Sequence, residues 1–252
     1  MKPVDARPQL QAFNGFLAKS DGKDKLTALI QYACMFISAG EPGNAKKIQA
    51  SVAAARKVFR VFRPLESVMP IINSPSINPN KPLPLEILAK LKALLMGVYF
   101  AADHVVWASQ AGIYTNKENI DRWQKVSLWS WFGGSGCTIV TELTELARLL
   151  QRRPKESEAE WNARRNKSLA EIDARLLTLV HASFQAALAV GLLQLRPWKP
   201  RFVGLLGIIA SAMNCYMLMP AVVRAPVVGK PKSDPLPQAP APAKAEPALK
   251  AA

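Results

Sequence analysis

The sequence has 252 residues, of which 50% are apolar and 20% are charged, and this composition excludes a generally disordered chain. Lys and Arg number 33 against 18 Asp and Glu, which gives a net charge of +15, and the mean hydropathy is +0.05. A chain that is basic and apolar at once is typical of proteins held at an anionic membrane. The three cysteines lie far apart and only two histidines are present. We therefore expect no disulfide framework, no metal site and no cofactor.

Apolar residues recur at spacings of three and four along most of the chain, and strand-like alternation is absent, so the sequence predicts an all-α fold. A first helix is predicted to open at Ser20 and Asp21, either of which can cap it, and to end at Gly40. The other predicted helices cover residues 44–63, 86–114 and 116–153, followed by one that ends at Pro197 and one that begins after Pro200.

Two uncharged stretches, 176–195 and 202–223, are each long enough to cross the hydrocarbon core of a bilayer. Each is bounded by arginine, and the six residues 196–201 between them allow only a tight antiparallel hairpin. A pair of buried helices in a soluble bundle is the alternative, but two such runs in tandem favour a transmembrane hairpin. Within the second stretch, a face of small residues is predicted to make helix contacts in lipid, including self-association: Gly204, Gly207 and Ser211.

A third apolar stretch, 93–113, leaves the number of membrane passes open because Asp103 and His104 lie at its centre. We interpret it as a helix that lies in the interface or against the other helices, with both polar side chains reaching water. The alternative is a further membrane span.

Residues 44–63 contain basic residues and no acidic one, and on a helical wheel the charges gather opposite the apolar side chains. This separation predicts a helix that lies in an anionic membrane surface, with Phe59 and Phe62 as wedges and Arg56, Arg60 and Arg63 at the head groups. The alternative is an ordinary solvated surface helix. The full set of predicted membrane-binding residues is Lys46, Lys47, Ile48, Val52, Arg56, Lys57, Phe59, Arg60, Phe62 and Arg63.

These elements predict an integral membrane protein with N-terminal amphipathic helices, long central helices and a C-terminal transmembrane hairpin. The expected divisions are an N-terminal and central helical region over 1–153, a charged connection over 154–166, the hairpin over 167–224 and a tail over 225–252. The tail consists mainly of Pro, Ala and Lys and is expected to be disordered, since it has too few apolar residues to offset the entropy of ordering.

Five segments, in order and with similar spacing, resemble the peroxin-11 family of peroxisomal membrane-elongation factors in its plant branch. They are DGKDKLTALIQYACMFIS (21–38), AARKVFRVFRPLE (54–66), HVVWASQAGIYTNKE (104–118), VGLLQLRPW (190–198) and VGLLGIIASAMNCYMLMP (203–220).

The resemblance implies a multi-pass protein of the peroxisomal membrane with both termini in the cytosol. It implies that the chain tubulates this membrane, associates with itself, and prepares the membrane for fission by a dynamin-related GTPase and its membrane adaptor. The family's membrane-remodelling helix corresponds to residues 44–63. The basic loop 196–201 would then face the lumen, whereas counting of Lys and Arg places such a loop on the cytosolic side.

The sequence contains no Gly-rich phosphate loop, metal-ligand cluster or nucleophile motif, so we do not expect an enzyme. A metabolite channel is the alternative function, with Asp103, His104 and His181 lining a polar path between helices. Binding of nucleic acid is not expected, because the hairpin argues against a soluble basic domain. The expected partners are anionic lipid, a second copy of the chain and, as the resemblance implies, the fission machinery.

Overall fold

The computed structural model describes residues 6–79, 81–116 and 119–221. Within these residues the chain is all-α, as predicted, with no strand. The helices are α1 (Arg7–Ala18), α2 (Ser20–Ser38), α3 (Asn44–Val58), α4 (Arg63–Asn73), α5 (Leu83–Gln110), α6 (Ile120–Leu150), α7 (Glu158–Lys167), α8 (Leu169–Leu192) and α9 (Pro200–Leu218). The predicted disordered tail, 225–252, lies outside the described residues.

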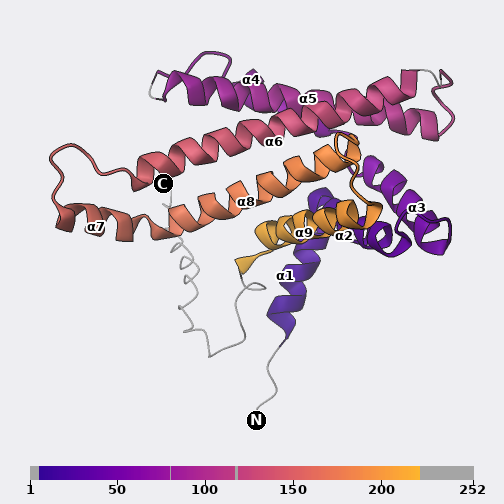
Figure 1. Ribbon diagram of the computed structural model, residues 1–252, viewed down its shortest axis with the longest axis horizontal. Helices are drawn as coiled ribbons and strands as arrows, with labels where there is room; N and C mark the ends of the chain where they lie inside the picture. Colours follow the sequence, from indigo (N-terminus) through magenta and orange to yellow (C-terminus); the bar gives the residue numbers. More distant parts are fainter. Residues whose placement is uncertain (1–5, 80, 117–118, 222–252) are drawn as a thin grey trace, which may run out of the picture.

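The longest helices, α5 and α6, form an antiparallel hairpin, and α4 folds back along α5 (Figure 1). The small residues in the middle of α6 allow this hairpin to close tightly. A Cβ added at Gly133 would lie 3.1 Å from a methyl group of Leu95, and one at Gly134 would lie 3.0 Å from the sulfur of Met96. The glycine run of α6 therefore serves close packing against α5.

The C-terminal hairpin packs on this first pair, with α8 along α6 and α9 along α8. Two polar contacts join α6 to α8: the Trp131 indole donates to Gln185 Oε1 at 3.0 Å, and Arg175 Nη1 lies 3.1 Å from Glu142 Oε2. The arginine that bounds the first predicted span is thus an inter-helix ion-pair partner as well as a flank.

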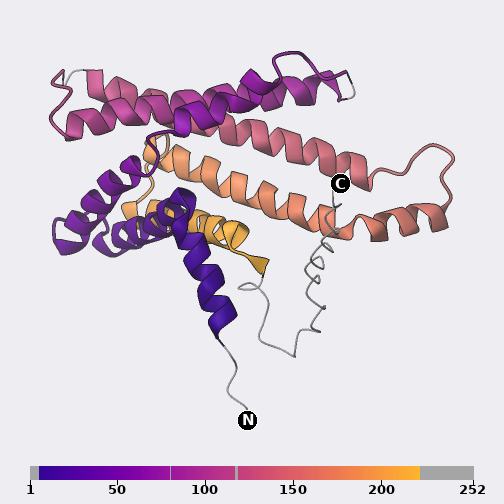
Figure 2. The same cartoon turned by 180° about the vertical axis from the view of Figure 1, so that it is seen from behind.

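The N-terminal helices complete the bundle, since α2 packs on α9 and α3 on α2, while α1 projects away from them (Figure 2). A cluster of buried apolar residues lies where α2, α8 and α9 meet: Ala28, Tyr32, Leu188, Val203, Leu206 and Ala210. Helix α3 also reaches α5. Six helices, α2, α3, α5, α6, α8 and α9, therefore surround a central cavity of about 330 Å³.

The structure corrects several predicted boundaries. The helix predicted over 44–63 ends at Val58, and after a turn the chain begins α4, in whose first turn Pro64 stands. Proline has no N–H to donate and its φ suits the first turn, so Pro64 starts a helix where we expected it to stop one. The N-cap of α2 is Lys19, without a side-chain hydrogen bond, instead of Ser20 or Asp21.

Three helices were not predicted: α4, described above, and also α1 and α7. The predicted charged connection, 154–166, contains most of α7, which begins with a reciprocal capping box: Ser157 Oγ accepts from the Glu160 N–H, and the Glu160 carboxylate accepts from the Ser157 N–H. The Ser-x-x-Glu pattern that signals such a box is present in the sequence. We did not predict this helix because the segment is highly charged and α7 has no apolar face, so no helical period is visible in its sequence.

Candidate membrane-binding surface

Helices α8 and α9 are both long and apolar enough to cross a membrane. They correspond to the predicted spans 176–195 and 202–223, although α8 begins seven residues earlier, at Leu169, and α9 ends at Leu218. Large apolar side chains on the two helices face outward, where lipid would contact them: Leu176, Val180, Phe202, Leu205, Tyr216 and Leu218. The connection, residues 193–199, carries Arg196 and Lys199, and the predicted flank Arg201 lies in the first turn of α9.

The small-residue face of α9 packs against α2 of the same chain. A Cβ at Gly204 would lie 2.7 Å from the backbone nitrogen of Phe36, and one at Gly207 would overlap the ring of Tyr32. Ser211, one turn further, is also buried. In this structure the residues predicted to make helix contacts do so within one molecule, and self-association of the chain stays a prediction.

The polar face of α3 lies toward the interior of the bundle, where its charged side chains contact Asp24 of α2. Asp24 is 2% exposed, and its Oδ1 lies 3.0 Å from Arg56 Nε and 2.8 Å from Arg60 Nε. Lys25 Nζ lies 3.1 Å from the second carboxylate oxygen. Burial alone would raise the pKa of Asp24, but the charges of Arg60, Arg56 and Lys25 outweigh it and hold that pKa well below its usual range.

A second buried carboxylate, Asp103 of α5, extends this cluster. Lys57 Nζ lies 3.3 Å from Asp103 Oδ1, and Arg60 Nη1 lies 3.5 Å from Oδ2 and donates to the Tyr99 hydroxyl at 3.0 Å. Burial raises the pKa of Tyr99 to about 12, so the phenol remains neutral beside Arg60. We call Asp24, Lys25, Arg56, Lys57, Arg60 and Asp103 the buried ion cluster.

The structure corrects the interpretation of residues 93–113 at Asp103 and His104. We expected Asp103 and His104 to reach water, but Asp103 is 9% exposed and binds Lys57 and Arg60. His104 Nδ1 donates to the carbonyl oxygen of Phe100 at 2.6 Å, and its buried Nε2 has no partner among the described residues. A carboxylate in an apolar helix needed a cationic partner, and α3 supplies it from 46 residues away.

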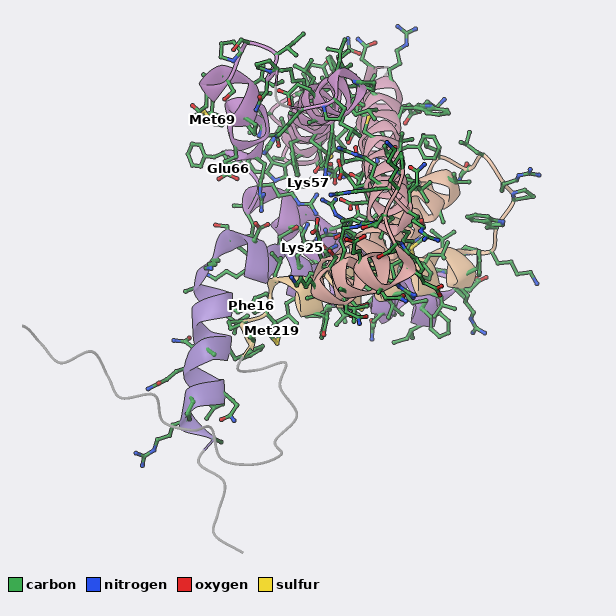
Figure 3. All side chains as sticks on the ribbon, turned by 90° about the vertical axis from the view of Figure 1, so that its left-hand side faces the viewer. Phe16, Lys25, Lys57, Glu66, Met69 and Met219 are labelled. Carbon is green, nitrogen blue, oxygen red and sulfur yellow. The ribbon has the colours of Figure 1, made fainter. Side chains whose placement is uncertain are left out.

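The apolar face of α3 consequently faces outward and is continued by α4. Phe62, in the turn between the helices, is 75% exposed. The exposed apolar side chains of this surface, which we call the outer apolar row, are Ile48, Val58, Val61, Phe62, Leu65, Met69 and Ile72. Figure 3 shows Met69 on the outer edge of α4, whereas Lys25 and Lys57 lie between the helices.

The ten predicted membrane-binding residues are therefore divided by the fold. Lys46, Lys47, Ile48 and Phe62 are exposed, and Arg56 and Arg60 are buried in the ion cluster. The others are half-buried: Val52, Lys57, Phe59 and Arg63.

Arg63, one of the half-buried residues, pairs with Asp21 of α2 and lies 3.4 Å from Glu66. Each arginine predicted to contact head groups thus has an acidic partner inside the chain.

Sequence reasoning missed the part of the row that α4 supplies. Phe62, Leu65, Met69 and Ile72 follow one another at spacings of three and four, which is the signal of one helix face. The helix predicted over 44–63 stopped before Pro64, and proline is not expected inside a helix. Pro70 lies inside α4.

Comparison with known proteins identifies the family. Residues 10–219 match the family model described as peroxisomal biogenesis factor 11 (PEX11). The chain is 37% identical over 237 residues to peroxisomal membrane protein 11-1 of Oryza sativa subsp. japonica, covering 90% of this chain and 98% of that protein. It is 36% identical over 227 residues to peroxisomal membrane protein 11D of Arabidopsis thaliana, covering 85% and 94%.

A more distant relative is peroxisomal membrane protein 11A of Homo sapiens, at 24% identity over 155 residues, which covers 57% of this chain and 60% of that protein. No solved structure matches the chain significantly. The match to the family model spans every helix except the start of α1, and it includes the buried ion cluster, the outer apolar row and the hairpin. The chain belongs to the peroxisomal biogenesis factor 11 family.

Proposed function

We propose that this chain elongates the peroxisomal membrane by inserting the outer apolar row of α3 and α4 into one leaflet beside its own membrane-anchored hairpin. The observation that carries the proposal is the outward exposure of this row, with Phe62 at its centre. Burial of a Val, Leu, Ile, Phe or Met side chain contributes about 1.5–3 kcal/mol, so several of them in one leaflet form a substantial anchor. Helices wedged into one leaflet displace head groups there and favour curvature.

The charged contacts in this proposal differ from those predicted from the sequence. Lys46 and Lys47 are exposed at the start of α3 and can reach anionic head groups directly. Arg56 and Arg60 can do so only if α3 separates from Asp24 and Asp103, which would leave buried charges without partners. We therefore assign the attraction to anionic lipid to the two lysines and assign the arginines to holding α3 in place.

The proposal includes the partners and the topology expected of the family. Elongation requires several copies on one membrane, so we propose self-association, and we propose that the elongated membrane is passed to a dynamin-related GTPase and its membrane adaptor. Both termini would lie in the cytosol, with α8 and α9 crossing the peroxisomal membrane. Protease protection of intact organelles, with tags at both ends and in the 196–201 loop, tests this topology.

Reconstitution of the full chain into phosphatidylcholine–phosphatidylserine vesicles tests the elongation itself. Phe62→Ser with Ile72→Ser removes two exposed members of the row and should abolish tubules visible by electron microscopy, while circular dichroism stays helical. The matched control is Ile87→Ser with Leu91→Ser, two exposed apolar residues of α5 outside the row. Tubulation by the Phe62/Ile72 variant at the level of the unmodified chain would contradict the proposal.

The channel alternative is less well supported by the geometry. Of the three residues expected to line a polar path, Asp103 borders the central cavity, whereas His104 and His181 are not among the described residues that line it. His181 Nε2 lies 2.8 Å from Gln185 Nε2, one turn along α8. The same vesicles, loaded with a small fluorescent solute, would leak if the chain conducts solutes and would stay sealed during tubulation if it does not.

A further inference from the structure

The central cavity is built as a cationic chamber. Its volume of about 330 Å³ is at the lower end of the range of small-molecule sites, roughly 300–1,000 Å³. Four cationic side chains line it: Lys25 from α2, Arg56 and Lys57 from α3, and Arg60 from the turn that follows. Asp103 is the one acidic residue that lines it within the described part of the chain.

The charges around the cavity do not balance. Asp24 lies against Lys25, Arg56 and Arg60, and Asp103 lies against Lys57 and Arg60. Four cations therefore share two carboxylates, an excess of two positive charges. Buried charge without a counter-charge is costly, so the chamber favours an anionic occupant.

Hydrogen-bond donors remain available for such an occupant. Arg56 donates through Nε to Asp24 and through Nη1 to Gln31, and Arg60 donates through Nε to Asp24 and through Nη1 to Tyr99. Neither Nη2 group makes a hydrogen bond to any described residue. Both arginines are more than nine-tenths buried, at 8% and 7% exposure, and both border the cavity. Guanidinium groups together with an ammonium are the usual protein ligands of phosphate oxygens.

We propose that this chamber is a binding site for a phosphate monoester dianion, held by Lys25, Arg56 and Arg60. The two negative charges of the ligand equal the excess on the protein. Two sources carry this chemistry: a soluble phosphate monoester, and the head group of a phosphatidic-acid-type lipid that enters beside α8 and α9, both of which line the cavity. The site goes beyond membrane elongation, because no residue of the outer apolar row lines the cavity.

The first experiment uses inorganic phosphate as the probe and thermal unfolding of the full chain in non-ionic detergent as the readout. At a pH where phosphate is mainly the dianion, it should raise the melting temperature saturably, and sodium chloride of equal ionic strength should not. Lys25→Gln should raise the half-saturating concentration about tenfold or more, since it removes a charged hydrogen-bond donor. Lys23→Gln, an exposed lysine on the same helix, is the control and should leave it unchanged.

A second measurement uses the unmodified chain alone, so the outcome does not depend on whether a variant folds. The ³¹P signal of inorganic phosphate should broaden on addition of the protein, and an excess of a competing phosphate monoester should reverse the change.

Mixed micelles of phosphatidic acid or phosphatidylglycerol distinguish the two sources. A lipid head group is supported as the ligand if phosphatidic acid stabilises the chain at a lower concentration than free phosphate does. The diester phosphatidylglycerol should then not stabilise it. Stabilisation by free phosphate alone supports a soluble ligand. Equal effects of phosphate and chloride without ³¹P broadening, or equal phosphate affinity of the unmodified and Lys25→Gln proteins, would overturn the proposal.

Discussion

Arg60 Nε lies 2.8 Å from Oδ1 of Asp24, a carboxylate that is 2% exposed and lies 36 residues earlier in the chain. This pair, with Arg56 on the same oxygen, determines which side of α3 faces the bundle. The apolar side of the helix is left outside as a result. The orientation on which the proposed membrane contact of α3 rests thus depends on a carboxylate in another helix.

Asp24→Asn should destabilise the fold strongly. The substitution keeps the volume of the side chain but leaves Arg56, Arg60 and Lys25 without their shared counter-charge, and removal of one partner of a buried ion pair costs about 3–5 kcal/mol. Denaturant unfolding of the detergent-solubilised chain measures the effect. Asp173→Asn, at an exposed position near the start of α8, is the matched control. Equal stability of the two variants would show that the ion cluster does not hold α3.

The contribution of Asp24 should also disappear in acid. Its pKa in the folded chain lies below that of the unfolded chain, which is about 3.9, so the stabilisation is fully present above about pH 4. As the pH falls further, the unfolded state takes up the proton first, and the stabilisation is lost progressively down to the folded pKa. The difference in unfolding midpoint between the unmodified chain and Asp24→Asn should therefore stay constant from about pH 6 to about pH 4 and become smaller from about pH 4 to about pH 3. A constant difference across this range would contradict the assignment.

Gly207→Ala tests the packing of α9 on α2. The added methyl group would overlap the ring of Tyr32, so we expect a loss of about 1–3 kcal/mol from overpacking. Gly136→Ala in α6 is the control, because a Cβ there meets no atom within 4 Å. Alanine is the better helix former, so the control should be neutral or should stabilise by up to about 1 kcal/mol. Chemical crosslinking in membranes distinguishes dimers from monomers. Fewer crosslinked dimers of Gly207→Ala than of the unmodified chain would show that the same face also joins two copies.

Lys46→Gln with Lys47→Gln should reduce the preference for anionic vesicles. Each basic group near such a surface contributes about 1 kcal/mol, so removal of two should weaken binding about thirtyfold. Binding to neutral phosphatidylcholine vesicles should stay the same, since the outer apolar row is intact. Vesicle co-sedimentation measures both, and Arg122→Gln with Lys125→Gln, two exposed basic residues of α6, is the control. A control variant that loses as much preference as the lysine variant would show that only net charge matters.

The sequence by itself determined the helical class, the hairpin and the separation of charged from apolar side chains over residues 44–63. These are local properties, since they follow from the apolar period, from the length of uncharged runs and from the wheel. It also carried two signals that we did not use, the capping box at Ser157 and the apolar spacing of Phe62, Leu65, Met69 and Ile72. Charge density concealed the first, and two prolines concealed the second.

Only the tertiary structure decided which face of α3 points inward. A helical wheel shows that two faces differ, but which face is buried depends on what the neighbouring helices offer, and here these are the carboxylates Asp24 and Asp103. The residues of α3 and of the following turn that pair with them, Arg56, Lys57 and Arg60, lie more than thirty positions away, so no local pattern reveals the pairing. The same reason applies to the cavity, whose excess charge appears only when six helices bring four cations and two carboxylates together.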